Sequence, residues 1–444
     1  LTQKEKENIC SKRVLLYLNF RKMDRIEIIG GNSLNGKIKI SGSKNSALPI
    51  MAASLLTKDK ISISNVPNLS DIKSMIELLK SLNVCVNFKS SKINLLSSTP
   101  KSLIGSYELV RKMRASFLIM GPLIAKYGKA SVSLPGGCAI GTRPVNLHLD
   151  GLSKMGVKFK IDRGYVTGEI KGRLKGADIE MDQKSVGATE NILMAATLAE
   201  GTTIIRNAAC EPEISDLSNF LNKMGANIRG YGTNKIVIKG KQFLNGCSHK
   251  IMPDRIESGT FVLCVFGCSG EIKLENVNNE ICMHLLKIFR QLKTLKLTIL
   301  DKGRCLLIKK TKNEDISLKI ETNEYPGFPT DLQAQLTSSL LKTKGISEIT
   351  ENIFENRFMH ISELIRMGAN LNQIGSKVIV TESKNLKGAE LMATDLRASS
   401  SLVIAGLMAK GKTTINRVYH LDRGYENLEK KLRQCGAKIR RIKS

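Results

Sequence analysis

The feature of this sequence that most constrains its fold is a unit that recurs six times along the chain. Each copy contains a helix end of the form Leu-x-x-apolar, a small residue, an alternating strand, a turn and a second apolar strand. Equivalent points lie roughly 70 residues apart, which is the regularity of an internal structural repeat. The six instances are residues 79–96, 152–166, 221–238, 289–308, 364–380 and 432–442.

Two further elements recur between these hairpins. One is a short strand that follows a Gly, Lys or Glu, as at residues 202–205, 272–274 and 413–415. The other is a helix rich in small residues. Each unit is therefore predicted to contain a helix, a strand, a loop, a second helix and a strand pair, which gives a mixed α/β fold. The small-residue helices are expected at 47–56, 114–127, 186–199, 257–267, 331–341 and 396–409.

The small-residue helices also predict how the units assemble. They lack a clear polar stripe, which indicates burial on all sides. Three units around three such helices make one domain, so six units predict two similar domains with a ligand cleft between them. The last unit is interpreted as lacking its opening strand. Residues 23–43 are therefore expected to complete a discontinuous domain with residues 253–444, while residues 44–252 form the second domain.

Composition limits the class of protein. The chain has 444 residues, 42% of them hydrophobic, which is enough for two cores. No stretch reaches the roughly 18 uninterrupted apolar residues of a membrane span, so we expect no membrane association. Ten cysteines without a CxxC pair predict neither a disulfide framework nor a zinc site, and indicate a cytoplasmic protein with reduced thiols. Residues 1–22 are expected to be a disordered extension, with the native start at Met23.

A formal net charge of +29 is the one property that favours nucleic-acid binding. The lysines, however, are spread along the whole chain, aromatic residues make up only 5% of it, and no motif interleaves basic and aromatic side chains. Specific recognition of a nucleic acid is therefore not expected.

Two loops place a reactive or anion-binding group beside a predicted helix start or beside glycines. Lys44 and Asn45 stand just before a helix, where the N-terminus and a lysine make an anion site; a solvated lysine is the alternative. In residues 134–144, three glycines and two prolines surround Cys138 and Arg143. The alternative there is a surface turn with an incidental cysteine, but the glycines and the arginine favour a mobile loop with a reactive thiol.

Further loops carry carboxylates and arginines. Asp331 follows Thr330 at the first turn of a predicted helix, where either residue can cap the helix, and a carboxylate held there can also act as a general base. Residues 354–358, 395–399 and 422–426 each join acidic residues to an arginine, and such neighbours are usually structural ion pairs. As a group they supply several arginines, which suits multiply charged phosphates.

The motifs SKN-ALP, PGGC-IG-RPV-LH, SVGAT, FPTD-QAQ, FENRFMH, DLRAS and DRGYE follow one another along the chain. In this set and order the chain from Met23 onward resembles the UDP-N-acetylglucosamine enolpyruvyl transferases (1-carboxyvinyltransferases). The resemblance implies an α/β fold of two similar domains, each of three inverse α/β repeats around buried helices, with the active site in the interdomain cleft. It implies transfer of the enolpyruvyl group of phosphoenolpyruvate to the 3′-hydroxyl of UDP-N-acetylglucosamine, the first committed step of peptidoglycan synthesis in the cytoplasm.

The resemblance also implies roles for individual residues. Cys138 corresponds to the loop cysteine that adds to phosphoenolpyruvate and is the target of fosfomycin, and Asp331 to the base that removes the hydroxyl proton. No cofactor and no metal are implied. Phosphoenolpyruvate is expected to contact Lys44, Asn45, Arg143, Arg397 and Arg423. UDP-N-acetylglucosamine is expected to contact Arg114, Arg143, Pro144, Val145, Asn146, Leu147, Gln183, Lys184, Ser185, Val186, Asp331 and Ile353.

Two positions depart from the family's pattern, and both concern the nucleotide contacts. Asn146 stands where Asp is usual in the RPVDLH motif, and Gln183-Lys184 differs from the commoner residues before SVGAT. Two alternatives to the implied activity stay open. One is the sister enzyme 5-enolpyruvylshikimate-3-phosphate synthase, which shares the fold but lacks the cysteine motif. The other is a basic binding protein that kept the fold and lost catalysis.

Overall fold

The computed structural model describes residues 24–134, 145–278, 294–310 and 315–443, together with Lys287, Phe289 and Leu292. Within them the repeats form six four-stranded sheets. All six sheets have one connectivity: a first strand runs parallel to the second, which pairs antiparallel with the third, which pairs antiparallel with the fourth. The prediction of six related α/β units is confirmed.

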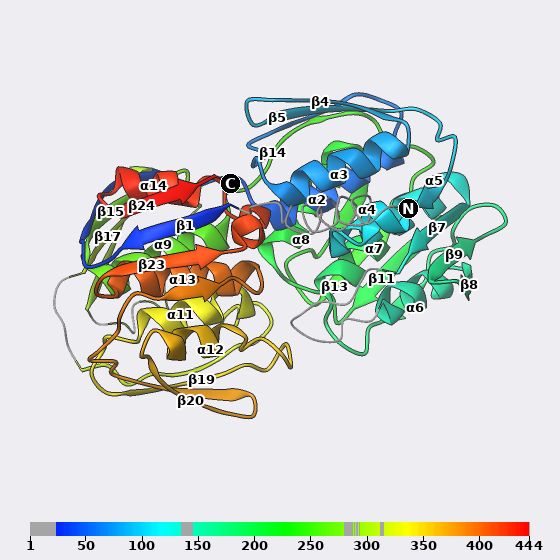
Figure 1. The fold of residues 1–444 in the computed structure, drawn as a ribbon. Helices are drawn as coiled ribbons and strands as arrows, with labels where there is room; N and C mark the ends of the chain where they lie inside the picture. Colours follow the sequence, from blue (N-terminus) through cyan, green and yellow to red (C-terminus); the bar gives the residue numbers. More distant parts are fainter. Residues whose placement is uncertain are drawn as a thin grey trace, which may run out of the picture.

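Three of the sheets belong to residues 44–252, called here the first half (Figure 1). In sheet order their strands are β14 (Ser248–Lys250), β3 (Ile61–Ser64), β5 (Lys92–Ser97) and β4 (Val84–Lys89); β6 (Ile104–Gly105), β7 (Lys129–Ser133), β9 (Tyr165–Glu169) and β8 (Lys158–Asp162); and β10 (Asp178–Glu180), β11 (Thr202–Arg206), β13 (Lys235–Lys239) and β12 (Asn227–Arg229). The helices of this half are α2 (Lys44–Ala53), α3 (Ser70–Ser81), α4 (Tyr107–Val110), α5 (Met120–Tyr127), α6 (Asn146–Lys154), α7 (Val186–Ala196) and α8 (Pro212–Lys223), with the 3₁₀ segments η1 (Ser54–Leu56) and η2 (Arg114–Ile119).

The other three sheets belong to residues 24–43 and 253–443, called here the second half (Figure 1). In sheet order their strands are β2 (Leu34–Lys39), β15 (Gly270–Glu275), β17 (Cys305–Lys310) and β16 (Leu295–Leu300); β18 (Lys319–Glu321), β19 (Ile346–Thr350), β21 (Lys377–Thr381) and β20 (Asn370–Ile374); and β22 (Glu390–Met392), β23 (Lys412–Asn416), β1 (Arg25–Ile29) and β24 (Lys438–Ile442). The helices of this half are α9 (Arg255–Cys268), α11 (Gln333–Ser339), α12 (His360–Arg366), α13 (Leu396–Met408) and α14 (Leu428–Gln434), with the 3₁₀ segments η3 (Asp301–Gly303), η4 (Thr330–Leu332) and η5 (Val418–Arg423).

Each half has its own hydrophobic core. One cluster runs from Ala47 to Ile251, and the other joins residues 26–40 to residues 256–439. The central helices α7, α9, α11 and α13 bury almost every residue, as their lack of a polar stripe predicted. Their small residues allow close packing: a Cβ added at Gly259 would lie 2.5 Å from Leu332 Cδ1. The domain boundaries drawn from the sequence stay a prediction.

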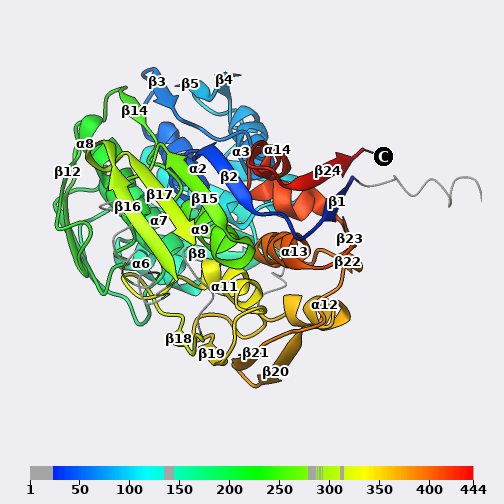
Figure 2. The same cartoon turned by 90° about the vertical axis from the view of Figure 1, so that its left-hand side faces the viewer.

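The start of the chain completes two sheets of the second half. Strand β1 lies between β23 and β24, with Ile28 opposite both Thr413 and Ile439 (Figure 1). The last unit lacks one strand of its own, as expected, but not the opening one: β22 and β23 supply its first two strands, and β1 supplies the third. Strand β2 runs parallel to β15 (Figure 2). No helix among the described residues is long and apolar enough to cross a membrane.

The two segments that connect the halves are hydrogen-bonded to each other. Ser43 N donates to Met252 O at 2.8 Å, and Asp254 N donates to Ser41 O at 2.9 Å. Ser43 is the N-cap of α2 and Asp254 is the N-cap of α9. The paired connections therefore bring the N-terminus of one helix from each half to the same place between the halves.

Candidate active site

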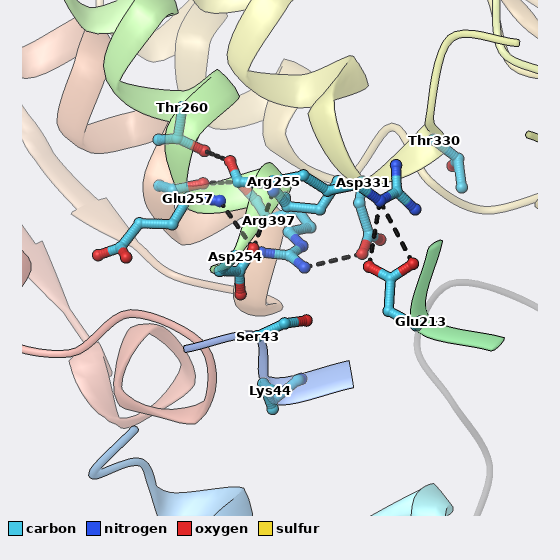
Figure 3. A network of polar contacts seen from close by, with 12 residues as sticks. Ser43, Lys44, Glu213, Asp254, Arg255, Glu257, Thr260, Thr330, Asp331 and Arg397 are labelled. Carbon is cyan, nitrogen blue, oxygen red and sulfur yellow. Dashed lines mark hydrogen bonds and ion pairs between the residues drawn. The ribbon is translucent and has the colours of Figure 1, made fainter. Parts of the chain in front are cut away.

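Asp331 lies in η4, directly before α11, and two arginines share its carboxylate. Oδ1 accepts a hydrogen bond from Arg357 Nη2 at 2.6 Å, and Oδ2 accepts one from Arg397 Nη2 at 2.7 Å (Figure 3). Both arginine side chains are 6% exposed, whereas the Asp331 side chain is 26% exposed. Burial opposes ionisation, but Arg397 and Arg357 hold the pKa of Asp331 well below its usual range. Asp331 is thus an ionised carboxylate that a ligand can reach.

Asp395 and Arg397 meet through the backbone of a helix start and not as the side-chain ion pair that such neighbours usually form. Asp395 caps α13 by accepting hydrogen bonds from the backbone N–H groups of Arg397 and Ala398. Neither Thr330 nor Asp331 caps a helix with its side chain. Thr330 instead accepts a hydrogen bond from Arg357 Nη1 at 2.9 Å. These contacts fix the two arginines that converge on Asp331.

A second carboxylate, Asp71 of α3, joins the two halves. Lys44 Nζ, at the start of α2, lies 3.1 Å from Asp71 Oδ2, and Arg423 Nε, at the end of η5, lies 2.9 Å from Asp71 Oδ1. The Asp71 side chain is almost completely buried. Burial raises the pKa of Asp71, but Lys44 and Arg423 outweigh it and lower the pKa overall. Asp71 belongs to no motif, so it was not among the site residues predicted from the sequence.

Besides Asp71–Arg423, a second ion pair crosses between the two halves. Arg255, at the start of α9, donates from Nε to Glu213 Oε1 of α8 at 3.1 Å (Figure 3). Its guanidinium also lies 5.7 Å from the ring centroid of Tyr325. Glu190 of α7 is a buried carboxyl group near Glu213. Its burial and the charge of Glu213 raise the pKa of Glu190 well above its ordinary value.

Glu213 neutralises Arg255 one to one, whereas Lys44 and Arg423 share Asp71, and Arg357 and Arg397 share Asp331, so each of these two groups keeps a net positive charge for an anionic ligand. Figure 3 shows Lys44 below the Asp331–Arg397 pair.

The two segments predicted to contact the nucleotide form neighbouring helix starts. Val145 is the N-cap of α6, and Ser185 caps α7 by accepting a hydrogen bond from Ala188 N. A Cβ added at Gly187 would lie 3.2 Å from His148 Cε1, so the first turns of α6 and α7 are in contact.

The other predicted site residues lie as follows. Ile353 N donates to Glu351 Oε1, and Glu351 Oε2 accepts from Thr330, which places Ile353 beside the η4 segment that carries Asp331. Asn45 is in the first turn of α2, next to Lys44, and Arg114 begins η2. Asn146 and Leu147 open α6, while Gln183 and Lys184 precede the cap of α7. Cys138, Arg143 and Pro144 lie outside the described residues.

The positive ends of several long helices face this site. The first turns of α2, α9 and α13 carry Lys44, Arg255 and Arg397, so the positive ends of these helix dipoles add to the side-chain charges. Such an arrangement favours a ligand with several negative charges. In the part of the chain that the structure describes, no three His, Cys, Asp or Glu side chains are placed to hold a metal ion.

Two solved structures show the same fold. The enolpyruvyl transferase NikO from Streptomyces tendae is 22% identical, with a TM-score of 0.85 over 95% of this chain and 100% of that chain. The EPSP synthase from Acinetobacter baumannii is 18% identical, with a TM-score of 0.71 over 94% of this chain and 100% of that chain. The fold is that of the enolpyruvyl transferases, as the repeats and motifs predicted.

Sequence comparison defines the family more narrowly. The sequence model of EPSP synthase (3-phosphoshikimate 1-carboxyvinyltransferase) matches residues 28–432. The UDP-N-acetylglucosamine 1-carboxyvinyltransferase of Paramagnetospirillum magneticum is 48% identical over 430 residues, covering 95% of this chain and 99% of that protein. The enzyme of that name from Rickettsia akari is 49% identical over 425 residues, covering 95% and 100%. The chain belongs to the UDP-N-acetylglucosamine 1-carboxyvinyltransferase family, which confirms the resemblance seen in its motifs.

Proposed function

We propose that this chain transfers the enolpyruvyl group of phosphoenolpyruvate to the 3′-hydroxyl of UDP-N-acetylglucosamine and releases phosphate. The observation that carries the proposal is the pairing of Asp331 with Arg397, close to Lys44 and Arg423. One partly exposed carboxylate among cations offers both a general base and an anion-binding surface. This combination suits a reaction between a hydroxyl group and a phosphorylated acid.

Phosphoenolpyruvate carries a phosphate and a carboxylate, and both groups match the donors of this site. We assign its binding to Lys44, Asn45, Arg143, Arg397 and Arg423. Arginine donates bidentate hydrogen bonds to either group, and the start of α2 adds backbone N–H groups. Lys44 and Arg423 come from opposite halves yet contact one carboxylate, Asp71, so a single anion can bridge the halves in the same way.

The sugar nucleotide is assigned to the neighbouring starts of α6 and α7 and to the loop beside Asp331. The contact between Gly187 and His148 supports the joint use of these two segments. Asn146 is a neutral residue at a position where the family usually has Asp, and it can still accept and donate hydrogen bonds. We assign the nucleotide to Arg114, residues 143–147, residues 183–186, Asp331 and Ile353.

The reaction proposed is an addition followed by an elimination. A proton adds to the methylene carbon of phosphoenolpyruvate, and the sugar oxygen attacks the central carbon as Asp331 removes the hydroxyl proton. Loss of a proton from the new methyl group and departure of phosphate then restore the double bond. The cations hold the phosphate and the carboxylate in place through both steps. Cys138 is proposed either as the proton donor or as a group that aids product release.

The same proposal includes a cellular role and an inhibitor. The product would enter peptidoglycan synthesis in the cytoplasm, and through it cell shape and cell division. Cys138 would be the residue that fosfomycin alkylates.

A substrate exchange tests the proposal against the sister enzyme. Purified protein is incubated with phosphoenolpyruvate and either UDP-N-acetylglucosamine or shikimate 3-phosphate, and phosphate release is followed. Release with the sugar nucleotide alone is the expected result. Release with shikimate 3-phosphate alone would assign the other activity. Release with neither, together with nucleic-acid binding that survives physiological salt, would favour the binding protein, since non-specific binding weakens steeply with salt.

A further inference from the structure

A buried phenol lies behind the Asp331–Arg397 pair. Tyr425 follows η5 and is 2% exposed within the core of the second half. Its hydroxyl lies 3.3 Å from Arg397 Nη1 of α13, 2.8 Å from Thr260 Oγ1 of α9 and 3.0 Å from Gln335 Nε2 of α11. Side chains from the N-terminal halves of α9, α11 and α13 therefore meet at one oxygen atom.

The three groups that contact the Tyr425 oxygen differ in which other hydrogen bonds they form. Thr260 Oγ1 also donates to the backbone carbonyl four residues before it, at 2.8 Å, and Gln335 Nε2 also donates to Asp331 O at 2.8 Å. Both groups keep a hydrogen bond if the phenol oxygen is removed. Arg397 is held from two sides, with Nη1 on Tyr425 and Nη2 on Asp331. Removal of the phenol oxygen would therefore release Nη1 while Nη2 stays bound to Asp331.

We propose that Tyr425 is a positioning residue that fixes Nη1 of Arg397 while Nη2 exchanges Asp331 for phosphoenolpyruvate. The inference rests on the proposed function, in which Arg397 binds that substrate and Asp331 is the base. A guanidinium that changes one partner keeps its orientation when its other edge stays bound. A neutral phenol oxygen suits this task because it accepts a hydrogen bond without neutralising the charge that the substrate needs.

Tyr425→Phe is the direct test because it removes the oxygen and keeps the ring. The ring centroid lies 5.6 Å from the Arg397 guanidinium carbon, so the contact with the ring face and the core packing survive the change. We expect the KM for phosphoenolpyruvate to rise about 3- to 10-fold, which is the net effect of losing one ordinary hydrogen bond. The KM for UDP-N-acetylglucosamine and the Tm are expected to stay close to those of the wild type.

Tyr127→Phe is the matched control. Tyr127 is partly buried against the core of the first half, so its replacement removes a phenol oxygen at a site remote from Arg397. We expect this variant to change neither KM. The split between the two substrates is the diagnostic result, since a purely structural role would lower the Tm and disturb both substrates alike.

Two outcomes overturn the inference: an unchanged KM for phosphoenolpyruvate in Tyr425→Phe, or equal changes for both substrates with a large fall in Tm. Calorimetric titration of phosphoenolpyruvate into the wild type and into Tyr425→Phe distinguishes a failure of this inference from a failure of the proposed function. Wild-type protein that releases no phosphate contradicts the proposed function. Equal affinity of the wild type and the variant for phosphoenolpyruvate contradicts the role of Tyr425.

Discussion

Arg397 Nη2 donates a hydrogen bond of 2.7 Å to Asp331 Oδ2, which joins the start of α13 to the segment before α11. In this state Asp331 is a weak base, because Arg397 and Arg357 stabilise its charge. If a substrate anion takes Arg397 away, the pKa of Asp331 rises toward its ordinary range. Binding of the first substrate would then increase the basicity of the group that activates the second.

Replacing Asp331 by Asn should suppress turnover more than it weakens binding. The amide cannot remove a proton, so we expect phosphate release to fall about 100-fold or more, while calorimetry still detects UDP-N-acetylglucosamine. Asp301→Asn is a matched control, because Asp301 pairs with Arg304 at an exposed site. Full turnover in Asp331→Asn would remove the carboxylate from the mechanism.

Replacing Asp71 by Asn should destabilise the protein. Lys44 and Arg423 would lose their shared counterion, and an unpaired cation near the interior is costly, so we expect the free energy of unfolding to fall by about 2 kcal/mol. Denaturant titration measures this change. Glu108→Gln breaks an exposed pair with Arg111 and should change the same quantity by about 0.5 kcal/mol or less. Equal effects of the two changes would contradict the role given to Asp71.

His360, buried at the start of α12, should make stability depend on pH. Burial lowers its pKa to about 4 from an ordinary value of 6.5, with Asp395 opposing and Arg357 adding to the shift. Between these values the unfolded chain binds a proton that the folded chain does not, so stability falls as the pH decreases from about 6.5 to about 4. The full effect is about 3 kcal/mol.

The variant His360→Gln isolates this contribution, because glutamine does not titrate. Denaturant unfolding at several pH values should give a shallower dependence on pH in the variant than in the wild type. Identical slopes in the two proteins would show that His360 does not retain its neutral form in the folded state.

Cys138→Ala should greatly impair turnover and abolish inhibition by fosfomycin, because the proposed function makes its thiolate the group that the epoxide alkylates. Cys85→Ala is the control, since Cys85 is an exposed free cysteine in the first half. Full fosfomycin sensitivity of Cys138→Ala, measured by phosphate release with and without the drug, would contradict the role of this residue.

The repeats made the fold predictable, because each unit repeats the same pattern of small-residue helix and alternating strands. What the pattern missed were the parallel strands β6, β10, β14, β18 and β22, which have only two or three residues and too little periodicity to recognise. Residues 23–43 were expected to complete the domain of residues 253–444, but the place of β1 as the third strand of the last sheet was not predicted. Strand β1 is separated from β23 by most of the chain, and only the folded structure shows their pairing.

Residues of the candidate site that belong to a motif could be predicted from the sequence. Contacts between residues that are far apart in the sequence could not. Asp331 and Arg397 were both expected in the site, but their direct pairing was not, because they are far apart in the sequence. Asp71 and Glu213 lie within ordinary amphipathic helices, and each becomes significant only through an arginine of the other half, Arg423 or Arg255. Sequence neighbours such as Asp395 and Arg397 have different partners, because Asp395 caps the backbone at the helix start while Arg397 reaches Asp331.

The central claim is tested most directly by following the product together with the released phosphate. Purified protein is given phosphoenolpyruvate with and without UDP-N-acetylglucosamine, and the nucleotide is analysed by mass spectrometry while phosphate is counted. We predict that phosphate appears only when the sugar nucleotide is present, and that each phosphate corresponds to one nucleotide carrying an enolpyruvyl ether at its 3′-oxygen. Phosphate release without the nucleotide, or an unmodified nucleotide after phosphate release, would contradict the account.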